Sequence, residues 1–210
     1  MSNTATVSAT PATPATLPGI GGWLFRSRSW IPVPLVLLLL IGSWGRLGSP
    51  EVMATLGVTL VILGEAMRIW AVRQIGVISR TRSGRLGRLV TEGPFTLVRN
   101  PLYVGNLLLW TGFTVWSGKL WLLAVCWTIF LLQYSAIIRL EEGLLTERFG
   151  DEYTAYVARV PRWWPKLTNL GVALRDRAHH PWRDTLFSER GTLIAIAVIS
   201  TLLVVARRWW

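Results

Sequence analysis

Residues 101–138 read PLYVGNLLLWTGFTVWSGKLWLLAVCWTIFLLQYSAII and contain one charged side chain, Lys119. Two apolar runs, 101–117 and 119–138, meet at Gly118 and its neighbours. Each run is close to the roughly 20 residues that a transmembrane helix needs. Because a backbone inside a bilayer must satisfy its own polar groups, we expect a helical hairpin that crosses the membrane and returns.

Three further apolar runs flank this hairpin, at 31–45, 52–72 and 191–206. The second of these would extend about 31 Å as a helix, which is enough to cross the hydrocarbon core. The last run is marginal for spanning because it is shorter. None shows the alternating polar face of a membrane β-barrel. The sequence therefore predicts an all-α, polytopic membrane helical bundle with about five transmembrane helices, in one domain over 19–210.

The 210-residue chain is apolar and basic at once. It is 51% hydrophobic and only 16% charged, yet 22 Lys+Arg face 11 Asp+Glu, for a net charge of +11. High hydrophobicity argues against a disordered chain, and the scarcity of charges argues against an ordinary soluble nucleic-acid binder. We expect the bilayer, and no nucleic acid, as partner. Residues 1–18 differ, because their uncharged Ala, Thr and Pro composition predicts a disordered tail.

The charges also predict an orientation. The loop 73–99 holds six Arg against one Glu, whereas the linkers at 46–50 and 118–119 hold one cation each. By the positive-inside rule this loop is cytoplasmic, and the segment 139–190, two crossings later, lies on the same side. Simple anchoring to anionic lipid is the alternative role of the arginines. We expect an integral protein of a bacterial-type inner membrane with its polar loops cytoplasmic; no feature indicates an oligomeric state.

Glu65 and Arg68 stand inside the apolar run 52–72. Their i, i+3 spacing places them on one helix face. An ionisable pair at membrane depth faces protein or a polar cavity rather than lipid. The pair is therefore either a structural ion pair or part of a catalytic site.

A polar motif precedes the hairpin, in the stretch 93–103. Pro101 suits the first turn of a helix, which makes Asn100 the expected N-cap. The positive end of that helix readily binds a carboxylate. Arg99 would add a bidentate contact and Tyr103 a hydroxyl.

A second polar motif follows the hairpin, where Glu141 and Glu142 are adjacent. Two neighbouring carboxylates repel each other, so a cationic partner is expected. That partner would be Arg139, Arg99 or the ammonium of a ligand. Gly150 is expected to end one helix.

Together the two motifs match the needs of an amino-acid-like zwitterion. Such a ligand requires a cation or helix start for its carboxylate and a glutamate for its ammonium, and aromatic faces suit an adenine or a sulfonium. The residues that supply this inventory are Arg99, Asn100, Tyr103, Glu141, Glu142, Tyr153 and Tyr156. No metal site is expected, because the single Cys126 lies in an apolar run and His179 and His180 lack further ligands.

These motifs resemble those of the isoprenylcysteine carboxyl methyltransferase family and its relatives, the phospholipid N-methyltransferases. The family pattern is Gly-Pro-Tyr, then Arg-His-Pro-x-Tyr-x-Gly, a hairpin, Glu-Glu and Phe-Gly-x-x-Tyr-x-x-Tyr. Here the two parts read GPFTLVRNPLYVGN (93–106) and EEGLLTERFGDEYTAYVARVPRWWP (141–165). The resemblance covers roughly residues 60–165.

The resemblance implies an integral-membrane methyltransferase that uses S-adenosylmethionine bound in a cytoplasmic pocket. Residues that would contact or shape the cofactor site are Arg99, Asn100, Pro101, Tyr103 and Gly105. Glu141 and Glu142 would bind its polar groups, and Tyr153, Tyr156 and Arg159 would help close the pocket. Two positions depart from the pattern. Asn100 replaces the His and cannot titrate near neutral pH, and Phe95 replaces a Tyr.

The expected acceptor is a membrane-embedded lipid or isoprenoid-type molecule with a carboxylate or an amine. A carboxylate needs no base, whereas an amine must lose a proton, for which Glu65 and the Glu141–Glu142 pair are candidates. Arg68 would hold an anionic lipid group. The catalytic candidates are therefore Glu65, Arg68 and Glu142. The alternatives are a non-catalytic transporter subunit or scaffold, and a sterol-reductase-like NADPH enzyme.

Overall fold

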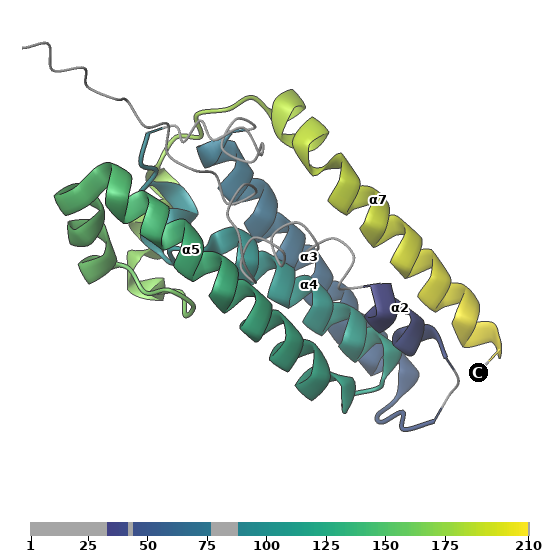
Figure 1. Ribbon diagram of the computed structural model, residues 1–210. Coiled ribbons are helices and arrows are strands. Elements are labelled where there is room, and N and C mark those ends of the chain that lie inside the picture. The colour runs from purple at the N-terminus through teal and green to yellow at the C-terminus, as the bar shows by residue number, and fades with distance from the viewer. Residues whose placement is uncertain (1–32, 42–43, 77–87, 210) are drawn as a thin grey trace, which may run out of the picture.

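The computed structural model describes residues 33–41, 44–76 and 88–209, and every regular element in these ranges is helical (Figure 1). The elements are α2 (Val33–Leu40), α3 (Pro50–Ile75), η2 (Gly93–Thr96), α4 (Pro101–Ser117), α5 (Leu122–Arg159), η3 (Leu167–Asn169), α6 (Leu170–Arg175), α7 (Trp182–Ala206) and η4 (Arg207–Trp209). The predicted all-α bundle is confirmed. The predicted tail, 1–18, and residues 77–87 of the basic loop lie outside the described residues.

The predicted hairpin is formed by α4 and α5. Helix α4 begins at Pro101 and ends at Gly118, which adopts the left-handed conformation with φ 76° and donates its N–H to the Val115 carbonyl. Glycine reaches this conformation without steric cost, so the chain turns within a few residues and α5 begins at Leu122. We call this end of the bundle the turn end.

A seam of four glycines brings α3 and α4 together, and the two helices lie side by side at the centre of the bundle (Figure 1). Gly57 and Gly64 of α3 face Gly112 and Gly105 of α4. A Cβ added at any of these positions would come within 2.6–2.8 Å of a backbone atom or side chain of the other helix. Small residues allow such close backbone approach between membrane helices. The seam therefore sets the relative rotation of α3 and α4.

Helix α5 is longer than the predicted span and continues to Arg159. Gly150 interrupts it with φ 47° and ψ −119°, which confirms the helix end predicted there. At 1.5 Å per residue, Glu142 lies about 30 Å along the axis from Leu122. The Glu141–Glu142 pair therefore stands about one hydrocarbon thickness from the turn end.

Helix α7 runs antiparallel to α3, with contacts at both ends. Near its start, the Arg73 guanidinium lies 3.9 Å from the centre of a Trp182 ring. Beyond its end, Arg207 donates to the carbonyls of Pro50 and Trp116, at 3.0 and 2.8 Å. The helix begins nine residues before the apolar run 191–206 and has 25 residues. The apolar run 191–206, which is marginal for spanning by itself, thus belongs to a helix that is long enough to cross a membrane.

Three described helices are long and apolar enough to span a membrane: α3, α5 and α7. Helix α4 has 17 residues and packs along α3. The expected first span, 31–45, contains only the eight-residue helix α2 in its described part, about 12 Å long and too short to cross. The carbonyls at the end of α2 accept hydrogen bonds from the Lys119 ammonium in the hairpin turn. The described residues therefore do not contain one membrane-spanning helix for each of the five predicted apolar runs.

Candidate functional site

A pocket lies at the end of the bundle opposite the hairpin turn, between the η2–α4 junction and both parts of α5. Its lining residues are Ile75, Arg88, Leu89, Val90, Phe95, Arg99, Asn100, Glu141, Glu142, Leu145, Phe149, Tyr153 and Tyr156. Six residues predicted to bind the cofactor are therefore brought together, although they come from two separate motifs. Both the loop 73–99, in its described part, and the segment 139–190, which are predicted to lie on the same side of the membrane, contribute residues to this pocket.

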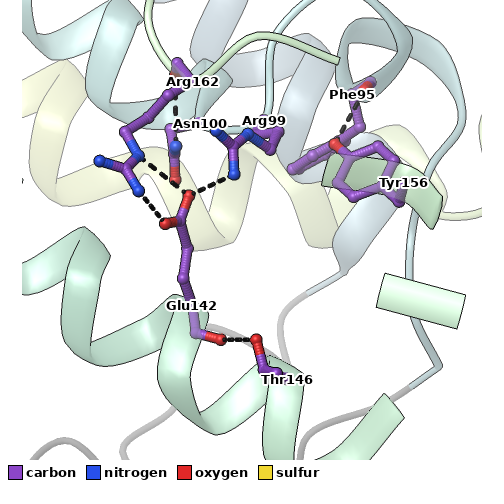
Figure 2. Close-up of polar contacts among 7 residues, drawn as sticks. All are labelled: Phe95, Arg99, Asn100, Glu142, Thr146, Tyr156 and Arg162. Carbon is purple, nitrogen blue, oxygen red and sulfur yellow. Dashed lines mark hydrogen bonds and ion pairs between the residues drawn. The ribbon is translucent and has the colours of Figure 1, made fainter. Parts of the chain in front are cut away.

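Glu142 is the centre of an ionic cluster in this pocket (Figure 2). Its Oε1 accepts from Arg99 Nη1 at 2.9 Å and from Arg162 Nε at 3.2 Å. Its Oε2 accepts from Arg162 Nη2 at 2.5 Å. We call Arg99, Glu142 and Arg162 the pocket cluster. The cluster joins two cations to one carboxylate. The cationic partner expected for Glu142 is therefore supplied by the chain itself.

Arg162 is a site residue that the sequence motifs did not single out. It lies just beyond α5, and its carbonyl accepts a hydrogen bond from Asn100 Nδ2 at 3.3 Å (Figure 2). The expected closing residue Arg159 is exposed instead, and its Nε donates to the Ala155 carbonyl of its own helix. The helix ends between the two arginines, at Val160. Because the chain turns there, Arg162 rather than Arg159 reaches Glu142.

Glu141 points to the neighbouring helix of the hairpin. Its Oε1 accepts a hydrogen bond from the Tyr103 hydroxyl at 2.9 Å. The Tyr103 ring packs against Tyr134, with centroids 4.8 Å apart. Tyr103 therefore supports the pocket through Glu141, and it is not among the lining residues.

The aromatic wall of the pocket stands on the part of α5 that follows Gly150. Tyr153 and Tyr156 are both buried, and they pack together with Val160. The Tyr156 hydroxyl donates to the Phe95 carbonyl at 2.8 Å, which ties α5 to η2 (Figure 2). Two backbone bonds reinforce this tie: the Arg99 N–H to the Pro161 carbonyl, and the Lys166 N–H to the Leu97 carbonyl, both 2.9 Å.

Two predicted site residues have other roles at the start of α4. Asn100 occupies the N-cap position, but its side chain makes no cap hydrogen bond, because Nδ2 is directed to Arg162. The capping role expected of that side chain is therefore wrong, while Pro101 does open the helix, buried at its first position. Gly105 does not line the pocket and faces Gly64 and Arg68 of α3 in the glycine seam.

Glu65 and Arg68 belong to a second ionic cluster, between α3, α4 and α7. Arg68 Nη2 lies 2.6 Å from Glu189 Oε2 and 2.9 Å from Thr192 Oγ1, and Nη1 bonds to Asn106 Oδ1. Glu65 Oε2 is more distant, 3.4 Å from Nε. We call these five residues the interhelix cluster. None of them lines the pocket.

A third group of polar contacts lies next to the pocket and includes its lining residue Arg88. Glu92 accepts from Arg88 at 3.1 Å and pairs with His179, and the pKa of Glu92 is lowered from its ordinary 4.5 mainly by the hydrogen bond to His179. His179 thus contacts a carboxylate, and its interfacial place stays a prediction. The described part of the chain contains no group of three or more His, Cys, Asp or Glu that could hold a metal.

Comparison with known proteins gives one family match. The model of the phospholipid methyltransferase family matches residues 52–152, which include α3, the hairpin and the Glu141–Glu142 pair. A plant relative also matches, the protein-S-isoprenylcysteine O-methyltransferase B of Arabidopsis thaliana. It is 32% identical over 120 residues, covering 52% of this chain and 57% of the relative.

Two bacterial relatives match over a longer stretch. The cobalt-zinc-cadmium resistance protein CzcN of Cupriavidus metallidurans is 34% identical over 169 residues, 77% of this chain and 74% of the relative. The nickel-cobalt-cadmium resistance protein NccN of Alcaligenes xylosoxydans xylosoxydans is 32% identical, with 77% and 75% covered. No solved structure matches the chain.

Proposed function

The chain belongs to the phospholipid methyltransferase family, and from this premise we propose that it transfers a methyl group from S-adenosylmethionine to a lipid or isoprenoid-type acceptor in the membrane. Family membership supports membrane methyltransferase activity. The cofactor, the acceptor and the cytoplasmic placement of the reaction are our proposal. The pocket around Glu142 is the proposed cofactor site.

One observation carries this proposal: the pocket holds cations, carboxylates and aromatic rings within contact of one another. The Arg99 Nε–H is buried and has no hydrogen-bond partner among the described residues. A buried donor without a partner is costly, and a ligand carboxylate would satisfy it. The residues present therefore fit an amino-acid-like ligand.

The chain's own groups have distinct proposed roles. Arg99 and the positive start of α4, where Asn100 lies, bind the ligand carboxylate. Glu142 and Glu141 bind its ammonium, and Tyr153 and Tyr156 bound the space for its adenine. Bound S-adenosylmethionine supplies a methyl group already activated on a sulfonium, so the protein's task is alignment of an in-line displacement and exclusion of water.

The acceptor side is proposed to face the bilayer. A carboxylate acceptor would need no base, whereas an amine acceptor would have to lose a proton to a residue of the chain. Glu65 and the Glu141–Glu142 pair remain the proposed proton acceptors. Arg68 is less suited to an anionic lipid group than the sequence suggests, because Asn106, Glu189 and Thr192 already accept from its guanidinium.

Ligand-induced thermal stabilisation in detergent tests the cofactor. A ligand that binds the folded state raises its apparent stability. We expect S-adenosylhomocysteine to raise the melting temperature and NADPH to leave it unchanged. Stabilisation by NADPH would favour the reductase alternative, and stabilisation by neither would favour a non-catalytic membrane protein.

Lipid mass spectrometry tests the acceptor. Lipid extracts from cells with the protein and from cells with the Glu142→Gln variant are compared for species heavier by one CH₂ unit. We expect such a species only with the unaltered protein. Equal amounts in both extracts would contradict methylation of an extractable lipid.

The names of the two bacterial relatives favour a second candidate, a physiological role in metal resistance. We propose that any such role acts through methylation of a membrane component. Metal tolerance of a deletion strain is then restored by the unaltered gene and not by Glu142→Gln. Full restoration by the variant would separate resistance from methyl transfer.

A further inference from the structure

An exposed apolar stripe lies outside the pocket, on the segment that follows α5. Trp164, Leu167 and Leu174 each expose between 67 and 75% of their surface, and Leu170 exposes 40%. Leu167, Leu170 and Leu174 follow the i, i+3, i+7 spacing of one helix face across η3 and α6. A contiguous apolar face of this kind marks a binding surface.

Other side chains of the same segment hold it to the pocket end of the bundle. Ala173 is fully buried there, and Asn169 Nδ2 donates to the Thr96 carbonyl at 3.1 Å. At the end of α6, Asp176 Oδ2 accepts from the Gly93 N–H at 2.6 Å. The stripe therefore cannot turn inward without breaking these bonds, and it stays directed away from the protein.

Charge identifies the partner. Around the stripe, Lys166, Arg175 and Arg177 are exposed. The acid in this segment, Asp176, is engaged by Gly93. An apolar face bordered by exposed cations is the composition of a helix that lies in the headgroup region of an anionic membrane. A soluble partner is disfavoured because the segment leads directly to the contact between the end of α3 and the start of α7, two helices long and apolar enough to span a membrane.

Backbone hydrogen bonds attach the stretch that follows α6 to the end of α3. The N–H groups of His179 and His180 both donate to the carbonyl of Arg73, in the last turn of α3. At the start of α7, Trp182 and Phe187 also expose 56 and 63%. Exposed apolar side chains therefore stand on both sides of the stretch that contacts the end of α3.

We propose that residues 164–174 form an interfacial anchor whose apolar stripe inserts into the headgroup region of an anionic leaflet, on the side of the membrane where the pocket opens. The anchor carries the pocket with it, because Arg162 and Lys166 bond to Glu142 and to the Leu97 carbonyl. Lipid contact would therefore hold one wall of the pocket in place. This inference requires a membrane protein, but it does not depend on the methyl acceptor.

Spin labels on single cysteines test the anchor in lipid nanodiscs. Cys126 is the chain's one cysteine and is buried, so a Cys126→Ala background accepts one label at a chosen site. Leu167→Cys and Leu174→Cys probe the stripe. Leu132→Cys, on the lipid-exposed face of α5, and Glu152→Cys, exposed beyond Gly150, are the lipid and water references.

In nanodiscs containing phosphatidylglycerol we expect labels at 167 and 174 to be several-fold more accessible to oxygen than to a water-soluble nickel chelate, as at 132. The label at 152 should show the reverse. Replacing phosphatidylglycerol by phosphatidylcholine should reduce the protection from nickel. Water-like accessibility at 167 and 174 would overturn the anchor, and protection independent of lipid charge would overturn its anionic partner. Labels at 132 and 152 that retain their contrast establish that the fold is intact.

Discussion

The two ionic clusters contain the same types of charged side chain in opposite ratios. The pocket cluster has two arginines and one glutamate, and the interhelix cluster has one arginine and two glutamates. The pocket cluster joins two arginines to Glu142, and the Arg162 side chain keeps 36% of its surface exposed. The interhelix cluster joins Glu65 and Glu189 to Arg68, and the Glu189 side chain has no exposed surface. Water or a ligand can replace a contact in the first cluster. In the second, removal of Arg68 or of one of the two glutamates leaves a buried charge without that ionic partner.

This difference separates a binding site from a structural tie. Within the pocket cluster the Arg162–Glu142 pair is partly exposed, and such a pair contributes little to stability, so a ligand can replace Arg162 at low cost. A buried pair opposes removal of either partner, and Arg68 links α7 to α3 and α4 through such contacts. The following variants test whether the two clusters divide binding and stability in this way.

The largest expected effect is on stability, from Arg68→Met. The variant leaves Glu65 and Glu189 as buried carboxylates without their guanidinium, and we expect a loss of about 3–5 kcal/mol in the free energy of unfolding. Denaturant or thermal unfolding in detergent measures it. Arg159→Met, at an exposed position, is the control and should change little. A loss for Arg68→Met no greater than the control's would refute the structural tie.

The second effect is on binding, from Glu142→Gln. A neutral amide loses the charge-assisted contact to a ligand ammonium, for which we expect about 10- to 100-fold weaker S-adenosylhomocysteine binding by calorimetry. Stability should change less than in Arg68→Met. Glu147→Gln, on the same helix and exposed, should bind normally. Equal affinities of the two variants would remove Glu142 from the site.

The third effect is intermediate and concerns the aromatic wall of the pocket, through Tyr156→Phe. The Phe95 carbonyl loses its buried donor, so we expect a loss of about 1–3 kcal/mol in stability. Thermal unfolding without ligand measures it. Tyr153→Phe is the comparison, because it removes a hydroxyl from the same wall and leaves the Phe95 carbonyl with its donor. A Tyr156→Phe protein as stable as the parent would contradict the tie between α5 and η2.

The smallest effect is a pH dependence at Glu92. Because the folded state lowers the pKa of this carboxyl below 4.5, its contribution is present above about pH 4.5 and is lost as the pH falls through the lower folded value. Glu92→Gln should therefore flatten the acid side of the melting-temperature profile slightly. The side chain is 40% exposed, so solvent screening keeps the change small. An unchanged profile would show that the pair with His179 contributes nothing.

Much of the fold was predictable because its signals are local. The hairpin follows from two apolar runs around Gly118, and the break at Gly150 follows from one glycine in a polar helical stretch. The glycine seam also had a signal, the seven-residue spacing of Gly57 to Gly64 and of Gly105 to Gly112, which the predictions did not use. Seven residues are close to two helical turns, so each pair lies on one face.

The site was predictable only in part. The two motifs identify Arg99, Glu141 and Glu142, since both stand at the same end of a hairpin. Arg162 was not predicted as a site residue because it lies past the end of α5, where helical spacing no longer indicates the direction of a side chain. Glu189 was not predicted as an ionic partner because Arg68 is 121 residues away in the sequence.

The sequence by itself determined that the chain is a helical membrane protein, that a hairpin brings two polar motifs to one end, and which residue types meet there. These follow from hydrophobic run length and from the need to satisfy every backbone group in lipid. The tertiary structure alone decided which charged residues pair, namely Arg162 with Glu142 and Glu189 with Arg68. It also decided that the apolar stripe on η3 and α6 points away from the protein. Partner choice depends on the rotation and register of packed helices, which the glycine seam sets by close contact and which no local pattern specifies.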